Sequence, residues 1–186
     1  MIKHEMEKTV VEWLPNARQI VSPNTNDRPK KTQVSLLVIH NISLPPGEFG
    51  GGHIEDFFCN RLSLEHPYFD TIGTLRVSAH LLIDRNGQVI QFAPFSRRAW
   101  HAGASIFDGH ENCNDYSIGI ELEGTDNIPY EAEQYAQLVK VTKLLMRAFP
   151  AITLERIVGH SDIAPVRKTD PGPSFDWAYY RQQLTT

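Results

Sequence analysis

The amino-acid sequence predicts one α/β domain of 186 residues, in which helices flank a mixed central β-sheet. Residues 35–40 form an unbroken apolar run, which is typical of a strand buried on both faces. Two strand-like runs enclose Asn86 and Gly87, which predicts an antiparallel hairpin. Apolar residues repeat at helical spacing over 131–149, which predicts an amphipathic helix. Because helices and strands mix and one strand pair is antiparallel, we expect a mixed sheet.

The N-terminal residues 1–34 are polar and interrupted by prolines, and we expect an arm packed on the domain. Residues 1–8 are charged throughout and lack an apolar stretch, so we expect no secretory leader. No apolar run approaches the ~20 residues that span a membrane. Cys59 and Cys113 stand alone, which suits a reducing compartment. We therefore expect a cytoplasmic protein without a membrane partner.

The next region contains a Pro- and Gly-rich loop at 44–52, a short helix at 54–62 and a further loop through 66–69. Together, residues 43–70 form an insert that we expect to wall a groove.

The predicted hairpin joins strands at 77–83 and 89–92 through a type I′ turn, since Asn-Gly favours positive φ at both central positions. The run at 116–123 alternates with the period of a strand. One face of this strand carries Ile118, Ile120 and Leu122, and the other carries Ser117, Gly119, Glu121 and Glu123.

The amphipathic helix is expected to have Pro129 in its first turn and to end at Pro150. A short strand follows at 156–159. Ser174 is expected to cap a last helix that ends near residue 184. Three aromatic residues are expected to dock that helix: Phe175, Trp177 and Tyr180.

Residues 159–173 carry the densest set of chemically active side chains, namely His160, Lys168 and Asp170. Three prolines lie in this segment, so we expect irregular structure rather than a helix. Long irregular segments within compact domains are usually functional.

His40 and His160 each end an apolar strand, and functional groups gather beyond the carboxyl ends of strands in α/β sheets. Two imidazoles and one carboxylate are a common zinc set with an open fourth position. Asp170 is the preferred third ligand, although it would also suit a turn before a proline. Asp162 is the competing carboxylate. The alternative is that the two histidines are unrelated.

Glu121 lies in a strand expected to be largely buried, where a carboxylate is costly unless paired or functional. It is the candidate general base, with Glu123 as the alternate on the same face. The competing interpretation is the exposed polar face of an edge strand. Lys168 is a candidate partner for a developing oxyanion, and a solvated surface lysine is the alternative. The net charge of -4 gives no indication of nucleic-acid or anionic-membrane binding.

Several sequence blocks, in the same order along almost the whole chain, resemble the bacterial zinc-dependent N-acetylmuramoyl-L-alanine amidases of the type-2 class. The blocks lie at 37–51, 75–80, 98–103, 113–115, 117–125 and 159–177. This family shares its fold with peptidoglycan-recognition proteins, so the resemblance implies that fold here.

The resemblance implies one zinc ion per chain, bound by His40, His160 and Asp170. It gives Glu121 the catalytic carboxylate role and Lys168 that of transition-state stabiliser. His80 and His101 resemble support and cleft-wall residues. The positions that resemble substrate contacts are Asn41, Arg76, Trp100 and Arg167.

The implied reaction, part of cell-wall recycling, cleaves the amide between the lactyl group of (1,6-anhydro)-N-acetylmuramic acid and L-alanine in muropeptides. We therefore expect a small-molecule anhydro-muropeptide as partner, and a monomer. Arg76 and Arg167 suit peptide carboxylates, and Trp100 suits the anhydro-sugar. Residues 109–113 contain no arginine, which departs from the family pattern and puts one peptide-carboxylate contact in doubt.

Two other function classes are possible from the sequence. One is a zinc-free peptidoglycan-binding module with this fold, which typically lacks the third ligand that Asp170 would provide. The other is an unrelated zinc peptidase, for which the sequence shows no HExxH motif.

Overall fold

The computed structural model describes residues 11–63 and 66–186. The expectations for the charged N-terminal stretch therefore lie outside the described residues. A six-stranded sheet has the order β1-β5-β4-β9-β3-β10, and all its neighbours are parallel except β4 and β5. Its strands are β1 (Arg18–Gln19), β3 (Leu36–Ile42), β4 (Leu81–Ile83), β5 (Val89–Gln91), β9 (Ser117–Glu123) and β10 (Ile157–Gly159). The predicted mixed sheet is confirmed.

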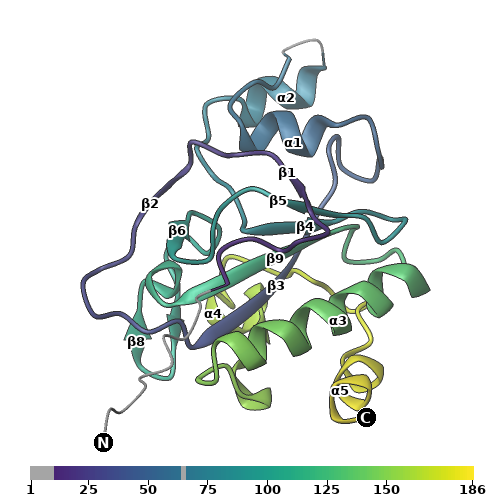
Figure 1. The fold of residues 1–186 in the computed structure, drawn as a ribbon. Coiled ribbons are helices and arrows are strands. Elements are labelled where there is room, and N and C mark those ends of the chain that lie inside the picture. Colours follow the sequence, from purple (N-terminus) through teal and green to yellow (C-terminus); the bar gives the residue numbers. More distant parts are fainter. Residues whose placement is uncertain (1–10, 64–65) are drawn as a thin grey trace, which may run out of the picture.

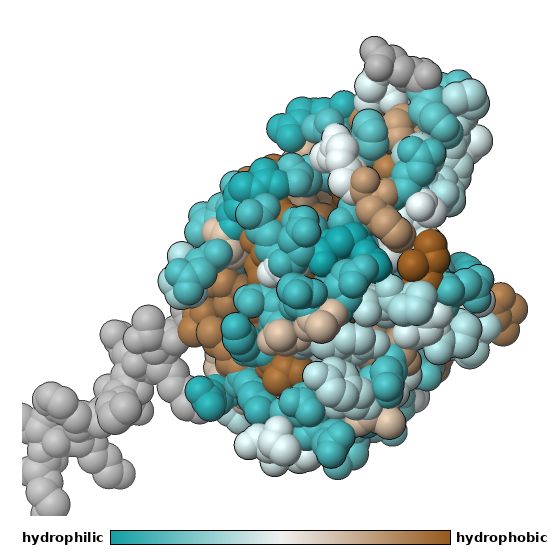
Figure 2. Space-filling view, turned by 90° about the vertical axis from the view of Figure 1, so that its right-hand side faces the viewer, coloured by the Kyte–Doolittle hydropathy of each residue, from teal (hydrophilic) through white to brown (hydrophobic). Residues whose placement is uncertain are grey.

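Helices cover the sheet on two sides (Figure 1). Helices α3 (Ala132–Ala148) and α5 (Trp177–Thr185) lie against one face. Helices α1 (His53–Phe58) and α2 (Pro67–Ile72) form a lobe at the top of Figure 1, away from α3 and α5. Figure 2 shows this lobe projecting above a largely hydrophilic face. No helix in the described ranges combines the length and apolar character needed to cross a membrane.

The remaining elements are short. They are β2 (Thr25–Asp27) paired with β6 (Arg97–Ala99), β7 (Ile106–Phe107) paired with β8 (His110–Glu111), the one-turn helix α4 (His160–Ile163), and the 3-10 turns η1 (Cys113–Asp115) and η2 (Leu154–Arg156).

The central strands β3 and β9 pair in parallel over seven residues and alternate between two environments. Their apolar side chains enter the core beneath α3, where Leu138 and Leu145 are fully buried. The strand residues on this side are Leu37, Ile39, Ile118, Ile120 and Leu122. His40 and Glu121 are register partners, so both point to the opposite face. The alternation predicted for β9 is confirmed.

Two predictions for the hairpin differ from the structure. The hairpin turn is not type I′, because Gly87 has positive φ (77°) but Asn86 does not. The Asp84 carboxylate accepts from the backbone N–H groups of Asn86 and Gln88, at 2.9 and 2.8 Å, which favours an ordinary turn followed by one left-handed glycine. The first hairpin strand is also shorter than predicted, since only Leu81–Ile83 pairs within the sheet.

The helix boundaries show further differences. Residues 66–69, expected as loop, begin α2, because His66 Nδ1 accepts from Tyr68 N at 3.1 Å and Pro67 takes the first helical position. Helix α5 is capped by the Asp176 carboxylate rather than by Ser174. Helix α1 ends at Phe58, four residues earlier than expected. Helix α3 follows the prediction closely, although its N-cap is Glu131 and Pro129 precedes it.

Candidate metal centre

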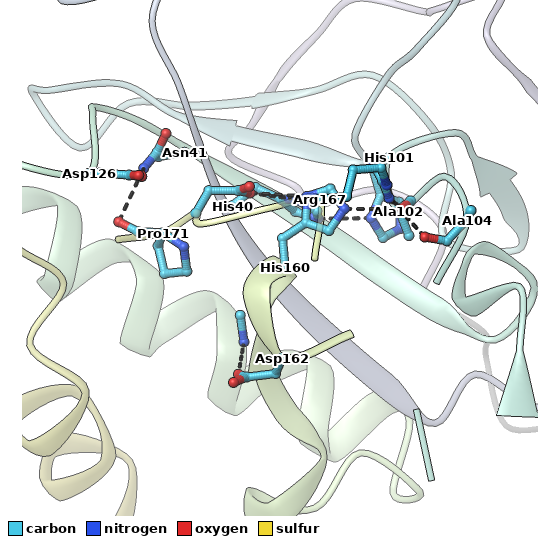
Figure 3. A network of polar contacts seen from close by, with 12 residues as sticks. His40, Asn41, His101, Ala102, Ala104, Asp126, His160, Asp162, Arg167 and Pro171 are labelled. Carbon is cyan, nitrogen blue, oxygen red and sulfur yellow. Dashed lines mark hydrogen bonds and ion pairs between the residues drawn. The ribbon is translucent and has the colours of Figure 1, made fainter. Parts of the chain in front are cut away.

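Three predicted ligands converge near the carboxyl ends of β3 and β10, although β3 continues for two residues past His40. His40 lies in β3, His160 directly follows β10, and Asp170 lies in the loop after α4. His40 Nδ1 and His160 Nδ1 are 2.9 Å apart, and Asp170 Oδ2 is 3.1 Å from each of them. All three side chains are buried, and Figure 3 shows the two imidazoles facing each other. The two strands are neighbours because Gly159 pairs with Ile39.

The donor atoms of this cluster fit a zinc ion. His160 Nε2 lies 3.0 Å from the carbonyl oxygen of Ala102, which only accepts, so Nε2 holds the proton and the Nδ1 lone pair faces the cluster. Two nitrogen atoms and one carboxylate oxygen, with tetrahedral bonds to zinc, would be separated by ~3.3 Å. The observed separations are close to that value. The His160 Nδ1 lone pair and the Asp170 carboxylate point at the same buried place, and a cation bound between them would stabilise both.

The pKa shifts agree with a ligand role. Burial lowers the pKa of His40 to about 4, and the contact with Asp170 offsets this only in part. Burial disfavours the charged form of Asp170, but its contacts with His160 and His40 outweigh that effect and lower the pKa of the carboxyl below its usual range. Neutral imidazoles and an ionised carboxylate are the forms that bind metal.

The segment after β10 contains a helix, contrary to the prediction. His160–Ile163 form one helical turn, in which Ala164 N donates to His160 O at 3.0 Å. The turn is possible because the first proline comes only at 165. The Asp162 carboxylate caps this turn by accepting from Gly159 N at 2.7 Å. The competing carboxylate is therefore directed at the backbone rather than at the metal cluster.

Three hydrogen bonds hold the loop that carries Asp170. The backbone oxygen of Asp170 accepts from Ser161 N at 3.0 Å. The next carbonyl, of Pro171, accepts from Tyr130 Oη at 2.7 Å and from Asn41 Nδ2 at 3.1 Å. The Asn41 amide also donates to Asp126 at 2.9 Å, as Figure 3 shows. Both N–H donors of the Asn41 amide are thus used by hydrogen bonds within the protein.

Glu121 is held beside the metal cluster by strand register. It pairs with His40 across β3 and β9 and is 9% exposed. Its Oε2 atom is buried and has no hydrogen-bond partner among residues 11–63 and 66–186. Burial, followed by the nearby Asp170 charge, raises the pKa of Glu121 well above its usual range, and Lys168 opposes this. An uncommitted carboxyl with a raised pKa is suited to proton transfer.

The alternate carboxylate, Glu123, has a structural task. Its two oxygens accept from Gly50 N at 2.6 Å and from Arg85 N at 3.1 Å. Glu123 therefore ties two loops to the end of β9, and Glu121 is the carboxylate left beside the metal cluster.

A cavity of about 620 Å³ opens beside the cluster, and His160, Asp170 and Glu121 are among its lining residues. Lys168 lines it as well. Its lining also includes apolar side chains of the 43–70 insert and its neighbours: Leu44, Phe57, Phe58, Tyr68, Ile72 and Val77. The arrangement combines titratable groups with apolar side chains, which is the usual character of a small-molecule site.

The four predicted substrate contacts differ in position. Besides Asn41, Trp100 lines the cavity, and its indole N–H donates to Asn26 Oδ1 at 2.9 Å. Arg167 also lines it, but its Nη2 donates to the carbonyls of Ala102 and Ala104 at 2.7 and 2.8 Å. Arg76 is exposed, lies outside the lining residues, and donates to the carbonyls of Gly73 and Leu75.

Sequence reasoning did not identify the contact between His101 and His40. His101 Nδ1 lies 2.9 Å from His40 Nε2, and the ring packs over Gly119 of β9. A Cβ atom at Gly119 would lie 2.5 Å from that ring, so this position requires glycine. A glycine within an otherwise regular strand is a signal of such a close approach.

The chain is similar to known proteins over most of its length. A family model described as N-acetylmuramoyl-L-alanine amidase matches residues 30–173. The 1,6-anhydro-N-acetylmuramyl-L-alanine amidase AmpD of Enterobacter cloacae is 54% identical over 175 residues, covering 94% of this chain and 93% of that protein. AmpD of Escherichia coli K12 is 54% identical over 170 residues, covering 91% and 92%.

Solved structures match as well. The crystal structure of a selenomethionine derivative of AmpD is 55% identical, with a TM-score of 0.90 over 92% of this chain and 96% of that one. The E. coli amidase AmiD, solved with anhydro-N-acetylmuramic acid-L-Ala-D-gamma-Glu-L-Lys, is 31% identical, with a TM-score of 0.59 over 85% of this chain and 61% of that one. These matches confirm the predicted resemblance and fold.

Proposed function

The chain belongs to the N-acetylmuramoyl-L-alanine amidase family, and we propose that it cleaves the amide between the lactyl group of 1,6-anhydro-N-acetylmuramic acid and L-alanine in muropeptides. The products are the anhydro-sugar acid and the free peptide, as in cell-wall recycling. The observation that carries the proposal is the His40, His160 and Asp170 cluster beside Glu121 in one cavity. The substrate class follows from AmpD relatives that align over more than 90% of both chains.

One zinc ion is the proposed cofactor, held by His40 Nδ1, His160 Nδ1 and an oxygen of Asp170. Bound there, zinc supplies Lewis acidity that activates water as a nucleophile near neutral pH.

Glu121 acts in this proposal as general base and then as general acid. It takes a proton from the attacking water and delivers it to the leaving alanine nitrogen. Its raised pKa and uncommitted Oε2 support this role. Lys168 lines the same cavity, and its ammonium group stabilises the negative charge that develops on the lactyl carbonyl oxygen.

The substrate's two halves suit different lining residues of the cavity. The apolar residues of the 43–70 insert, together with Trp100, suit the anhydro-sugar, whereas Arg167 suits a peptide carboxylate. Asn41 is assigned to holding the Asp170 loop in addition to lining the cavity. Arg76 would reach substrate only by leaving its present backbone contacts.

We further propose that the protein acts as a cytoplasmic monomer. Cys59 and Cys113 are both free and buried, which suits a reducing compartment. The competing function, a zinc-free peptidoglycan-binding module, is disfavoured because Asp170 and Glu121 both face the cavity.

Metal analysis combined with an assay on anhydro-muramyl-tripeptide tests this function. We expect about one zinc per chain, loss of hydrolysis on chelation, and recovery with added zinc. Glu121→Gln should retain zinc and substrate binding but lose turnover. Full activity in a rigorously metal-free preparation would contradict the zinc proposal. Substrate binding without zinc uptake and without hydrolysis would instead favour the zinc-free binding module.

A further inference from the structure

Behind the metal cluster, three side chains form a continuous line of polar contacts from β9 to β3. Ser117 Oγ lies 3.1 Å from His101 Nε2, and His101 Nδ1 lies 2.9 Å from His40 Nε2. His40 Nδ1 is the atom that faces His160 and Asp170. Figure 3 shows His101 on the far side of His40 from Asn41. The line therefore ends at His40 Nε2, on the ring whose other nitrogen is proposed to bind zinc.

The protons on this line can be arranged in two directions. In one, the Ser117 hydroxyl donates to His101 Nε2, His101 Nδ1–H donates to His40 Nε2, and His40 carries its one proton at Nδ1. In the other, His40 Nε2–H donates to His101 Nδ1, and His101 Nε2–H donates to Ser117 Oγ. Both directions use the same number of protons, because a neutral imidazole has one N–H and a hydroxyl can donate or accept.

Only the second direction is compatible with a metal at His40. A zinc ligand must offer a lone pair, so Nδ1 must be free of its proton and Nε2 must hold it. The acceptor for that proton is His101 Nδ1. We propose that His101 is a positioning residue, which holds His40 in its Nε2–H form, with Ser117 supporting His101, and so presents the Nδ1 lone pair to zinc. This inference rests on the proposed zinc role of His40.

The surroundings of His101 keep its ring in place for this task. The His101 ring packs directly over Gly119, where any Cβ atom would collide with the ring. The backbone N–H groups of His101 and Ala102 both donate to Asn114 Oδ1, at 3.1 and 2.8 Å. The Ala102 carbonyl in turn accepts from His160 Nε2. Two adjacent residues thus determine the proton positions on both histidine ligands. The His101 side chain acts on His40, and the Ala102 carbonyl acts on His160.

Zinc affinity tests the proposal by competition of the full-length protein with a chromophoric chelator. His101→Leu removes the acceptor, and we expect the zinc Kd to weaken about 10–100-fold. His101→Asn should stay within a few-fold of wild type, because its Oδ1 lies two bonds beyond Cβ, as Nδ1 does. His110→Leu is the matched control, since His110 is exposed on β8 and its backbone contact survives the change.

The proton positions can also be observed directly, without any variant. Long-range ¹H–¹⁵N correlation spectra of the zinc-loaded wild type should show His40 and His101 each protonated at Nε2. A proton on His101 Nδ1 in the zinc form would overturn the proposal. This measurement decides the question even where His101→Leu does not fold.

The outcomes separate this inference from the proposed function. A wild-type chain that takes up no zinc contradicts the proposed function itself. A wild-type chain that binds zinc, together with a folded His101→Leu variant of equal affinity, overturns only the role of His101. An Asn variant as weak as the Leu variant would show that ring packing, and not the acceptor, supports His40.

Discussion

The two faces of the β3–β9 strand pair are both buried, yet their chemistry is opposite. The face under α3 carries Leu37, Ile39 and Ile120, which are fully buried among other apolar residues. The other face carries His40, Glu121 and Gly119. Burial therefore does not distinguish a core from a site within this sheet. What differs is whether the buried groups have satisfied partners, and on the second face one carboxylate oxygen does not.

Stability and chemistry are thus divided between the two sides of the same strands. Apolar burial on the α3 side contributes favourable free energy of folding. A buried, unpartnered carboxyl opposes folding, so a fold that contains one must be stabilised elsewhere. Substitutions on one face at a time test whether stability and chemistry are separate in this way.

The largest effect is expected when a ligand is removed from the site face. His160→Ala should abolish zinc binding and reduce turnover of anhydro-muramyl-tripeptide by about 10³-fold or more, since a catalytic metal supplies several kcal/mol of transition-state stabilisation. The metal-free variant should unfold near the same denaturant concentration as the metal-free wild type. Zinc stoichiometry and urea denaturation check the two parts, and a variant with intact activity would remove His160 from the centre.

The matching change on the α3 face should reverse the pattern. Ile120→Ala creates a cavity in a fully buried position, and we expect a loss of about 2–5 kcal/mol in unfolding free energy. Zinc content and turnover per folded molecule should stay close to wild type. Denaturation curves with parallel assays measure this. A selective loss of turnover in a stably folded Ile120→Ala protein would show that the two faces are not independent.

The pH dependence of stability should reveal the cost of the site face. The pKa of Glu121 is raised in the folded chain, so its neutral form favours folding below the ordinary value of 4.5, and this contribution is lost as pH rises through the folded pKa. The Glu121→Gln variant does not lose this stability, because the glutamine side chain does not ionise. In metal-free protein, the variant should therefore gain stability over wild type as pH rises above 4.5, in denaturation series from acidic to neutral pH. A difference that does not vary with pH would contradict the raised pKa.

The smallest expected effect lies at the far end of the line to His40. Ser117→Ala leaves His101 Nε2 without its partner, so we expect zinc to bind at most about 10-fold more weakly. Chelator competition checks this value against wild type. A weakening larger than that of His101→Leu would show that Ser117 acts by another route.

Local sequence patterns predicted the helix and strands of the α3 side well. The alternation of β9 and the apolar spacing of α3 each reflect one repeating geometry, which a single element displays by itself. Errors came where one local contact outweighed a general preference. The His66 side chain started α2 in a stretch expected as loop, and the Asp84 carboxylate changed the hairpin turn.

The candidate site was predicted unevenly for the same reason. His40, His160 and Asp170 follow from strand ends, a proline-rich loop and the family resemblance, and the structure brings their donor atoms together. Glu121 was preferred to Glu123 from the resemblance, and the contacts that Glu123 makes with Gly50 and Arg85 add the physical reason. The exposed position of Arg76 likewise has no signal in the sequence.

The sequence by itself determined the class of fold, the family and the three candidate ligands, because these depend on local periodicity and on residues that stand in recognisable blocks. Only the tertiary structure decided which partners complete each side chain. His101 meets His40 across 61 positions of sequence, and Ala102 meets His160 across 58. Such contacts arise from strand order and close packing, which bring together atoms that no local pattern connects.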